Sequence, residues 1–228
     1  MKGIQFMNKS VNLYSNNKKT SIYFIGYLFF FYCTWTLKEL WLIQYIYGFN
    51  DQIVPFFSAF FKITIWIIPV LVYIKGFLHE KPLDYMKLNI NIFKGCSWGV
   101  FLSLLMGLRF IIEVYVVKQQ TFNVFSNSNN YLNVFLIAGL TEEIVFRGFI
   151  LNELTKRFTF LRANVITAFL FLIVHYPAWF YSGELFDLWY HFYIFSLGLL
   201  FGYIYKEVNS LWTVIILHSF HNLFVIIS

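Results

Sequence analysis

Long apolar stretches separated by short polar segments occupy almost the whole chain. Spanning a membrane as a helix takes about 20 predominantly apolar residues, and seven stretches approach or exceed that length, at residues 21–47, 53–75, 93–116, 131–155, 161–180, 188–205 and 210–227. Only a short polar break around residues 182–184 separates the fifth from the sixth, which leaves the count open by one. The pattern predicts an all-α polytopic membrane protein with about seven transmembrane helices. Because Lys38 and Glu39 interrupt the first stretch, we expect that helix to end or fray there.

Composition supports the membrane class. Of 228 residues, 59% are hydrophobic and 12% are charged, whereas soluble domains average about 25% charged residues. Aromatic residues reach 23%, which suits lipid-facing surfaces and membrane interfaces, and we expect most of the seven tryptophans to be interfacial anchors. Cys33 and Cys96 have no metal-type spacing and form no disulfide framework, so we expect buried thiols.

The distribution of charge predicts orientation and not a nucleic-acid partner. The net charge is +6, but no Lys/Arg cluster interleaved with aromatics forms a nucleic-acid-binding stripe. The positive charges fall in alternate loops, as the positive-inside rule predicts for cytoplasmic segments: Lys2, Lys9, Lys18 and Lys19; Lys75, Lys81, Lys87 and Lys94; Lys156, Arg157 and Arg162; and Lys206. With seven helices, the N-terminus is cytoplasmic and the C-terminus outside, in a multi-pass protein of the cell membrane. About twenty mostly polar residues precede the first helix, so we expect it to stay uncleaved.

The fourth stretch contains two adjacent glutamates and an arginine, Glu142, Glu143 and Arg147. A charged side chain near the bilayer centre costs about 2.5 kcal/mol or more, so such residues usually mark a functional site. Glu143 and Arg147 have the i, i+4 spacing of an intrahelical ion pair. Glu142 points about 100° away from Glu143 on an α-helix. We therefore expect Glu143 to pair with Arg147 and to leave Glu142 free for chemistry.

Three further polar residues lie at the same depth as Glu142. His175, His218, Asn222 and Glu142 are each 12 to 16 residues from the nearest cytoplasmic Lys or Arg, which is about 18–24 Å along a helix. His218 and Asn222 share one helix face because they are i and i+4. The sequence thus predicts that polar groups of three helices converge in one layer.

Two other features concern the helices around this layer. Pro177, two residues after His175, cannot donate a backbone hydrogen bond and is expected to bend its helix near the site. Gly198 and Gly202 form a small-xxx-small face, which favours close helix packing.

The remaining membrane-embedded polar residues have less specific interpretations. His221 is either a donor behind the site or a packing residue. Arg109 and Glu113 are i and i+4 toward the outer end of the third helix, where they can pair. For these two and for Lys62 we favour a structural role. The His-Glu-x-x-His motif of zinc proteases is absent, and although two of the histidines are i, i+3, we predict no metal.

Three motifs in order are Glu-Glu-x-x-x-Arg at 142–147, Phe-x-x-x-His at 171–175 and His-x-x-x-Asn at 218–222. Together they resemble the CPBP (Abi) family, the type II CAAX prenyl endopeptidases and their bacterial relatives, which include bacteriocin-processing and bacteriocin-immunity proteins. The resemblance covers roughly residues 131–226. It implies a metal-independent intramembrane glutamate endopeptidase without cofactor. In such an enzyme Glu142 is the general base, His175 helps it to activate water, His218 and Asn222 stabilise the oxyanion, and Glu143 and Arg147 hold the scaffold.

The domain division follows from the same motifs. The longest polar loop, Gln119 to Asn130, separates residues 1–130, with helices one to three, from residues 131–228, with a catalytic core of four helices. The expected partner besides the lipid bilayer is a membrane-associated peptide or protein substrate. The composition is typical of an AT-rich bacterial genome, which favours a propeptide over a prenylated protein. The alternatives are a non-catalytic bacteriocin-immunity or peptide-binding protein and a proton-coupled transporter, which the lack of inverted repeats disfavours.

Overall fold

The fold is entirely helical over the part of the chain that the structure describes. It is a computed structural model, and it describes residues 21–46, 48, 53–124 and 130–228. Every regular element in these ranges is a helix and none is a strand, which confirms the all-α part of the predicted fold class. The expectation of an uncleaved N-terminal segment concerns residues 1–20, which lie outside the described residues.

Several long helices are built from α-helical and π-helical (η) pieces in direct succession. Residues 21–37 are helical and continue into η1 (Lys38–Leu42) and α2 (Ile43–Ile46). The other elements are α3 (Val54–Tyr73) with η2 (Ile74–Leu78), α4 (Pro82–Tyr85), α5 (Ile92–Ile111) with η3 (Ile112–Val117), η4 (Asn130–Ala138) with α6 (Gly139–Glu143), η5 (Ile144–Leu151) and α7 (Asn152–Thr155), α8 (Phe160–Ile173), α9 (Tyr176–Ser182), α10 (Leu188–Val208) and α11 (Leu211–Ile227).

Four helices of the described part are long and apolar enough to cross a membrane. They are Val54–Leu78, Ile92–Val117, Phe160–Ser182 and Leu188–Val208. Their mean hydropathy and length support a membrane protein, but the predicted number of seven transmembrane helices is not confirmed. α11, at 17 residues, is a shorter apolar helix.

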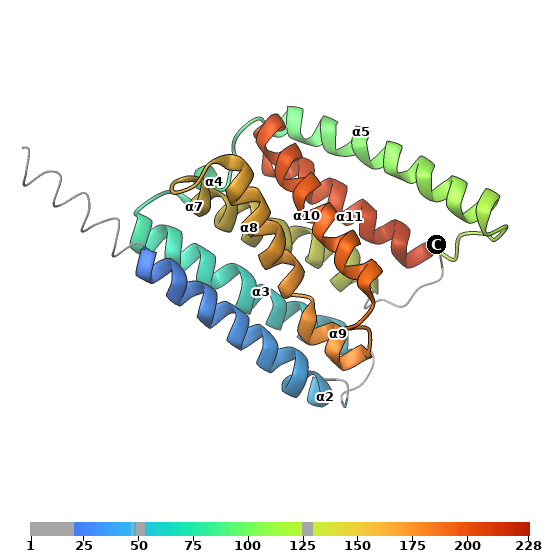
Figure 1. The fold of residues 1–228 in the computed structure, drawn as a ribbon, viewed down its shortest axis with the longest axis horizontal. Coiled ribbons are helices and arrows are strands. Elements are labelled where there is room, and N and C mark those ends of the chain that lie inside the picture. Colours follow the sequence, from blue (N-terminus) through green and yellow to red (C-terminus); the bar gives the residue numbers. More distant parts are fainter. Residues whose placement is uncertain (1–20, 47, 49–52, 125–129) are drawn as a thin grey trace, which may run out of the picture.

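The helix that runs from η4 to α7 lies at the centre of the bundle. Residues 141–151 are buried on every side, as expected of a helix surrounded by others. It contacts α3, α8, α10 and α11. Figure 1 shows these around it, with the first helix and α3 along one edge of the molecule and α5 along the opposite edge, beside α11. The two glutamates and the arginine of this helix therefore face protein and not lipid.

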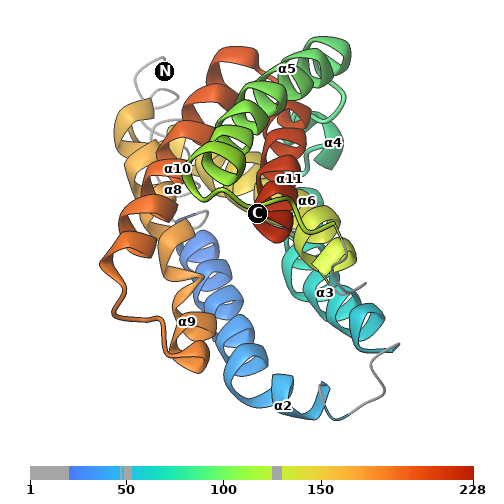
Figure 2. The same ribbon diagram turned by 90° about the vertical axis from the view of Figure 1, so that its right-hand side faces the viewer.

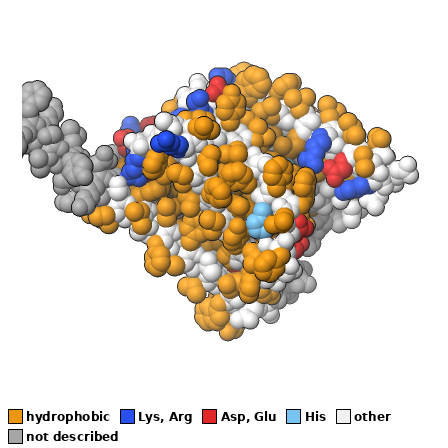
Figure 3. Space-filling view, viewed as in Figure 1, with side chains coloured by type: hydrophobic (Ala, Val, Ile, Leu, Met, Phe, Trp, Pro, Cys, Tyr) orange, Lys and Arg blue, Asp and Glu red, His pale blue; other side chains and the backbone are white. Residues whose placement is uncertain are grey.

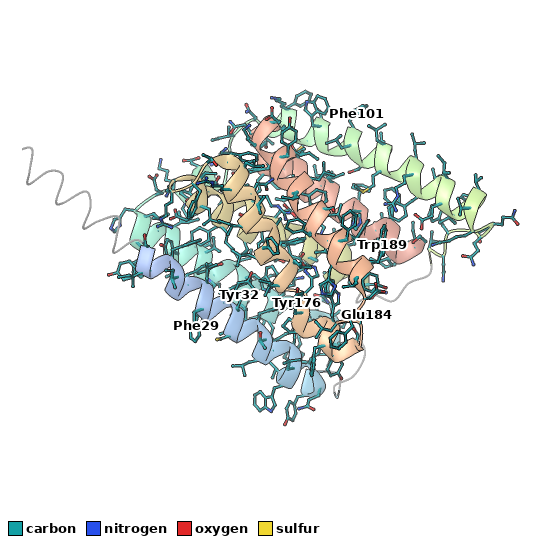
Figure 4. All side chains as sticks on the ribbon, viewed as in Figure 1. Phe29, Tyr32, Phe101, Tyr176, Glu184 and Trp189 are labelled. Atoms are coloured by element: carbon teal, nitrogen blue, oxygen red, sulfur yellow. The ribbon has the colours of Figure 1, made fainter. Side chains whose placement is uncertain are left out.

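The first helix packs one aromatic face on this centre. Phe24, Tyr27, Phe31 and Trp35 recur every three or four residues and are buried, which is the spacing of one helix face. Their rings make edge contacts with rings of α3 and η5. The other face of this helix is exposed and apolar. Figure 4 shows Phe29 pointing outward on that side.

Close helix approaches depend on small residues. The Gly198 and Gly202 face predicted from the sequence packs on α8, where a Cβ at Gly198 would lie 3.0 Å from the Cβ of Ala168. A similar approach joins α6 to α11, since a Cβ at Gly139 would lie 2.9 Å from the backbone N of Ser219. These contacts bring the polar residues of α6 and α11 within reach of each other.

Two expectations about the first half are wrong. The first helix does not end at Lys38 and Glu39, because it continues through η1 and α2. Both side chains turn inward, are buried and pair with each other at 2.8 Å, so neither charge faces lipid. Cys33 is exposed and Cys96 is half-buried, so neither is a fully buried thiol.

The surface matches a membrane environment. The face in Figure 3 is hydrophobic across its middle, and charged side chains lie mainly toward its margins. Large apolar side chains are exposed along the first helix, α3, α5 and α10. Such a surface is unfavourable in water and favourable in lipid.

Candidate active site

One cavity of about 340 Å³ brings the predicted site residues together. Glu142 of α6, His175 between α8 and α9, and His218 and Asn222 of α11 all line it. Figure 2 shows α3, α6, α9, α10 and α11, which contribute its walls. The predicted convergence of three helices in one layer is thus present in the structure. Cavity-lining residues also come from the first half of the chain: Trp35, Lys38, Glu39, Lys62 and Trp66.

Beneath the cavity lies a buried hydrogen-bonded cluster around Glu143. Its Oε1 atom accepts hydrogen bonds from Nη1 of Arg147 at 2.8 Å and from Nδ1 of His218 at 2.7 Å. Arg147 also donates from Nη2 to the carbonyl oxygen of Gly198 at 3.0 Å. The side chains of Glu143 and Arg147 are completely buried. The predicted pairing of these two residues is confirmed.

The guanidinium of Arg147 is also enclosed by aromatic rings. Its centre lies 4.6 Å from the ring of Phe171 and 5.5 Å from that of Phe201, distances at which a cation is attracted to an aromatic face. Arg147 therefore ties η5 to α8 and α10 as well as to α11 through Glu143. The three residues Glu143, Arg147 and His218 thus form one buried hydrogen-bonded cluster.

Glu142 has a partner that the sequence did not indicate. The Nζ atom of Lys62, on α3, lies 2.8 Å from Oε1 of Glu142. The other oxygen, Oε2, lies 3.8 Å from Nε2 of His218. The sequence predicted that Glu142 is left free by the Glu143–Arg147 pair, and it is instead paired with Lys62. Lys62, for which a structural role was favoured, lines the cavity. The reason is that α3, from the half without motifs, packs directly on α6.

His175 occupies the break between α8 and α9. Its backbone N bonds to the carbonyl of Leu172, three residues back, so the carbonyl of Phe171 is left for the side chain, and Nδ1 of His175 lies 2.8 Å from it. A carbonyl only accepts, so Nδ1 carries the proton and Nε2 is an acceptor. Pro177 lies in the first turn of α9, which confirms the predicted bend.

The first helix closes over this break. Trp35 donates from Nε1 to the carbonyl oxygen of Val174 at 3.1 Å, and the hydroxyl of Tyr32 donates to that of Leu170 at 2.6 Å. The carbonyl of Leu170 also accepts from the backbone N of Val174 at 3.2 Å, so the Tyr32 hydroxyl is its second donor. Figure 4 shows Tyr32 close to Tyr176 at the start of α9, and both line a second, more open hollow. The position of His175 is thus supported from the N-terminal half.

A chain of hydrogen bonds fixes Asn222. Its Nδ2 donates to the carbonyl oxygen of Val134 in η4 at 2.9 Å, which fixes the orientation of the amide. In this orientation Oδ1 faces Nδ1 of His221, at 3.2 Å. Since Oδ1 only accepts, Nδ1 of His221 carries the proton, and Nε2 accepts from the hydroxyl of Tyr193 at 2.6 Å. His221 also lines the cavity, and this geometry favours its interpretation as a donor that orients Asn222 over that of a packing residue. Tyr193 was not singled out by the sequence.

The pair Arg109 and Glu113 lies on the surface, away from the cavity. Nη2 of Arg109 is 3.3 Å from Oε2 of Glu113, and the Arg109 side chain is 55% exposed. The pairing predicted from their spacing is confirmed. Among the described residues, no group of three or more His, Cys, Asp or Glu is placed to hold a metal ion, and the metal-independence of the site stays a prediction.

A signal for Lys62 was present in the sequence. It lies thirteen residues before Lys75, which is about 20 Å along a helix, and this is the depth that also singled out Glu142 and the histidines. Trp35 and Trp66 gave no such signal. Tryptophan is common at membrane interfaces, yet these two are buried beside the cavity.

Comparison with known proteins finds one similar family. Residues 126–224 match the family model described as Rce1-like, type II CAAX prenyl endopeptidase Rce1-like. The match includes all three motifs, and it supports a membrane protease. The resemblance predicted from the sequence is confirmed for residues 126–224, which are similar to this family. No curated protein and no solved structure shows a significant match to the chain.

Proposed function

We propose that the protein is an intramembrane endopeptidase that cleaves a membrane-associated peptide or protein with water activated by Glu142. The observation that carries the proposal is that Glu142, His175, His218 and Asn222 line one and the same cavity. Proteolysis needs a base, a water site and oxyanion donors within a few ångströms of one another. The Rce1-like match over the same residues supports this chemistry.

The proposed water site lies between Glu142 and His175. Oε2 of Glu142 lies 3.8 Å from Nε2 of His218, whereas Oε1 is bound to Lys62. The acceptor Nε2 of His175 follows from its Nδ1 contact with Phe171. A water that donates one hydrogen to each of these acceptors presents its lone pair to the substrate. Glu142 then takes the proton as the oxygen attacks the scissile carbonyl carbon.

The proposed oxyanion site is formed by Asn222 and His218. Nδ2 of Asn222 has two hydrogens, of which one is donated to Val134, and the other is directed to the tetrahedral oxygen. His218 donates its Nδ1 hydrogen to Glu143, so its Nε2 can donate to an oxyanion only when the ring is doubly protonated. Glu143, whose Oε1 lies 2.7 Å from Nδ1, supplies negative charge beside that ring.

Collapse of the intermediate returns the proton. The carbon–nitrogen bond breaks, Glu142 gives its proton to the leaving amine, and the new carboxyl group keeps one oxygen from water. The mechanism uses side chains and water alone. Since the cavity lies among apolar helices, a substrate that is itself embedded in or attached to the membrane is best placed to enter it. A peptide precursor is the substrate class that we propose.

The experiment compares cells that express wild type, no protein, or Glu142→Gln at equal membrane abundance. This substitution nearly preserves shape and removes the base. Secreted and membrane peptides are profiled by mass spectrometry. We expect the same fragments to be missing from the deletion strain and from Glu142→Gln. If Glu142→Gln matches wild type while the deletion differs, a non-catalytic immunity or peptide-binding role replaces the protease.

A further inference from the structure

Lys62 is a largely buried cation on a helix that carries none of the family motifs. It lies in the middle of α3, a candidate membrane span, and its side chain is only 14% exposed. Ionisable residues at this depth are costly and usually functional. Residues 126–224, which match the Rce1-like family, do not include it.

Groups from several helices hold the ammonium in place. Nζ of Lys62 lies 2.8 Å from Oε1 of Glu142 and 5.0 Å from the ring centre of Trp66, one turn further along α3. The ring of Trp35, from the first helix, lies 5.7 Å away on another side. The two indole rings are perpendicular, with centres 5.0 Å apart. Aromatic faces attract a cation most strongly where water is excluded.

Lys62 makes the two carboxylate oxygens of Glu142 inequivalent. Oε1 is bound to the ammonium, and Oε2 lies on the side of His218, 3.8 Å from its Nε2. A carboxylate that lost this contact would be able to turn about its terminal bond, since such torsions have broad minima. The lysine thus selects which oxygen faces the cavity.

The lysine also balances the charge of the site. Arg147 is bound to Glu143 and to the carbonyl of Gly198, so Lys62 is the cation bound directly to Glu142. With both ion pairs formed, two carboxylates face two cations. A buried carboxylate without its cation is strongly unfavourable.

We propose that Lys62 is a positioning residue for the reaction, which fixes Oε1 of Glu142 so that Oε2 is presented to water, and that the first half of the chain is therefore part of the catalytic machinery. The proposal rests on the proposed function. Lys62 acts through Glu142. A purely structural ion pair would affect how much folded protein accumulates, whereas a positioning residue affects turnover by the protein that has folded.

The test compares wild type with four variants, each of which carries one substitution in the whole chain. Lys62→Met removes the charge and keeps an unbranched apolar side chain, and Lys62→Arg keeps the charge. Glu142→Gln tests the base. Lys118→Met is the matched control, because Lys118 also forms an ion pair, with Glu113 at 3.3 Å, but is 42% exposed and lies away from the cavity. Fragments that depend on the protein are quantified by mass spectrometry and divided by its membrane abundance.

We expect Lys62→Met to lower fragment formation per folded molecule about 100-fold, the effect of a misplaced catalytic group. Lys62→Arg is expected to restore a large part of it, and Lys118→Met to match wild type. If Lys62→Met retains wild-type turnover while Glu142→Gln is inactive, the positioning role is wrong and the protease stands. If Glu142→Gln itself is fully active, the proposed function is wrong, and the positioning role that rests on it is wrong as well.

A spectroscopic measurement keeps the proposal testable if Lys62→Met accumulates poorly. The infrared band of Glu142 is isolated as the difference between each protein and its Glu142→Gln counterpart, for wild type, Lys62→Arg and the small amount of Lys62→Met that can be purified. We expect the band to be similar in wild type and Lys62→Arg and to move in Lys62→Met. An unchanged band in Lys62→Met would show that the lysine does not bind Glu142 and would overturn the proposal.

Discussion

Nδ1 of His218 lies 2.7 Å from the same Glu143 oxygen that accepts a hydrogen bond from Arg147. This oxygen joins α11 to the central helix and fixes which ring nitrogen of His218 carries a proton. Carboxylates that orient a histidine in this way are a general device of active sites. Here the carboxylate is itself held by a fully buried arginine, so the geometry of His218 depends on residues that do not line the cavity.

The first prediction concerns Arg147. Replacing it with methionine leaves Glu143 as a buried charge without its cation, and breaking such a pair costs about 3–5 kcal/mol. We expect Arg147→Met to lower the free energy of unfolding in mixed micelles by that amount. The matched control is Arg109→Met, which breaks another i, i+4 pair with a glutamate, but one that is exposed, and is expected to cost about 0.5 kcal/mol or less. Equal effects of the two substitutions would contradict the central position of Arg147.

The second prediction concerns Tyr193, whose hydroxyl binds Nε2 of His221 and through it orients Asn222. Tyr193→Phe removes one hydrogen bond from this chain, worth about 1 kcal/mol. We expect fragment formation per molecule to fall by about tenfold or somewhat less, with little change in abundance. Tyr203→Phe on the same helix removes an exposed hydroxyl and is the control. Equal rates of fragment formation by the two variants would show that the hydrogen bonds from Tyr193 through His221 do not position Asn222.

Much of the site could be predicted from the sequence because helix geometry alone determines the depth of its residues and the face on which each one lies. The depth count placed Glu142, His175 and Asn222 in one layer, and the i, i+4 rule paired Glu143 with Arg147. Both arguments need only the rise and period of a helix. The fold class followed from the apolar stretches for the same reason.

The errors concern contacts between helices that are distant in sequence. Lys62 meets Glu142 across 80 residues and Trp35 meets Val174 across 139, and no local period encodes either contact. Lys38 and Glu39 looked like a helix end because charge is unfavourable in lipid, but they turn toward the cavity and pair. A burial cost is avoided when the side chain faces a polar interior, and the sequence does not show which way a residue faces.

The third prediction concerns the close approach of α6 and α11. A Cβ at Gly139 would lie 2.9 Å from the N of Ser219 and 3.0 Å from its Cα, and backbone cannot move aside as a flexible side chain can. We expect Gly139→Ala to destabilise the protein by about 1–3 kcal/mol and to reduce fragment formation by separating Glu142 from His218.

Gly26→Ala is the control for this substitution, because nothing lies within 4 Å of a Cβ at that position of the first helix. It is expected to be neutral or stabilising by up to about 1 kcal/mol, since glycine disfavours helix interiors. Thermal unfolding of both variants in detergent measures the difference. A neutral Gly139→Ala would mean that the two helices are farther apart than the structure shows.

The origin of the oxygen in the product tests water activation by Glu142 most directly. Membranes that contain wild type or Glu142→Gln at equal abundance are incubated in ¹⁸O-enriched water with a synthetic precursor of a fragment that depends on the protein. Hydrolysis by activated water predicts one ¹⁸O atom in the new carboxyl terminus with wild type, and almost no product with Glu142→Gln, because general-base catalysis contributes about 10²- to 10⁴-fold. Equal amounts of labelled fragment from both proteins would contradict the assignment of Glu142 as the base.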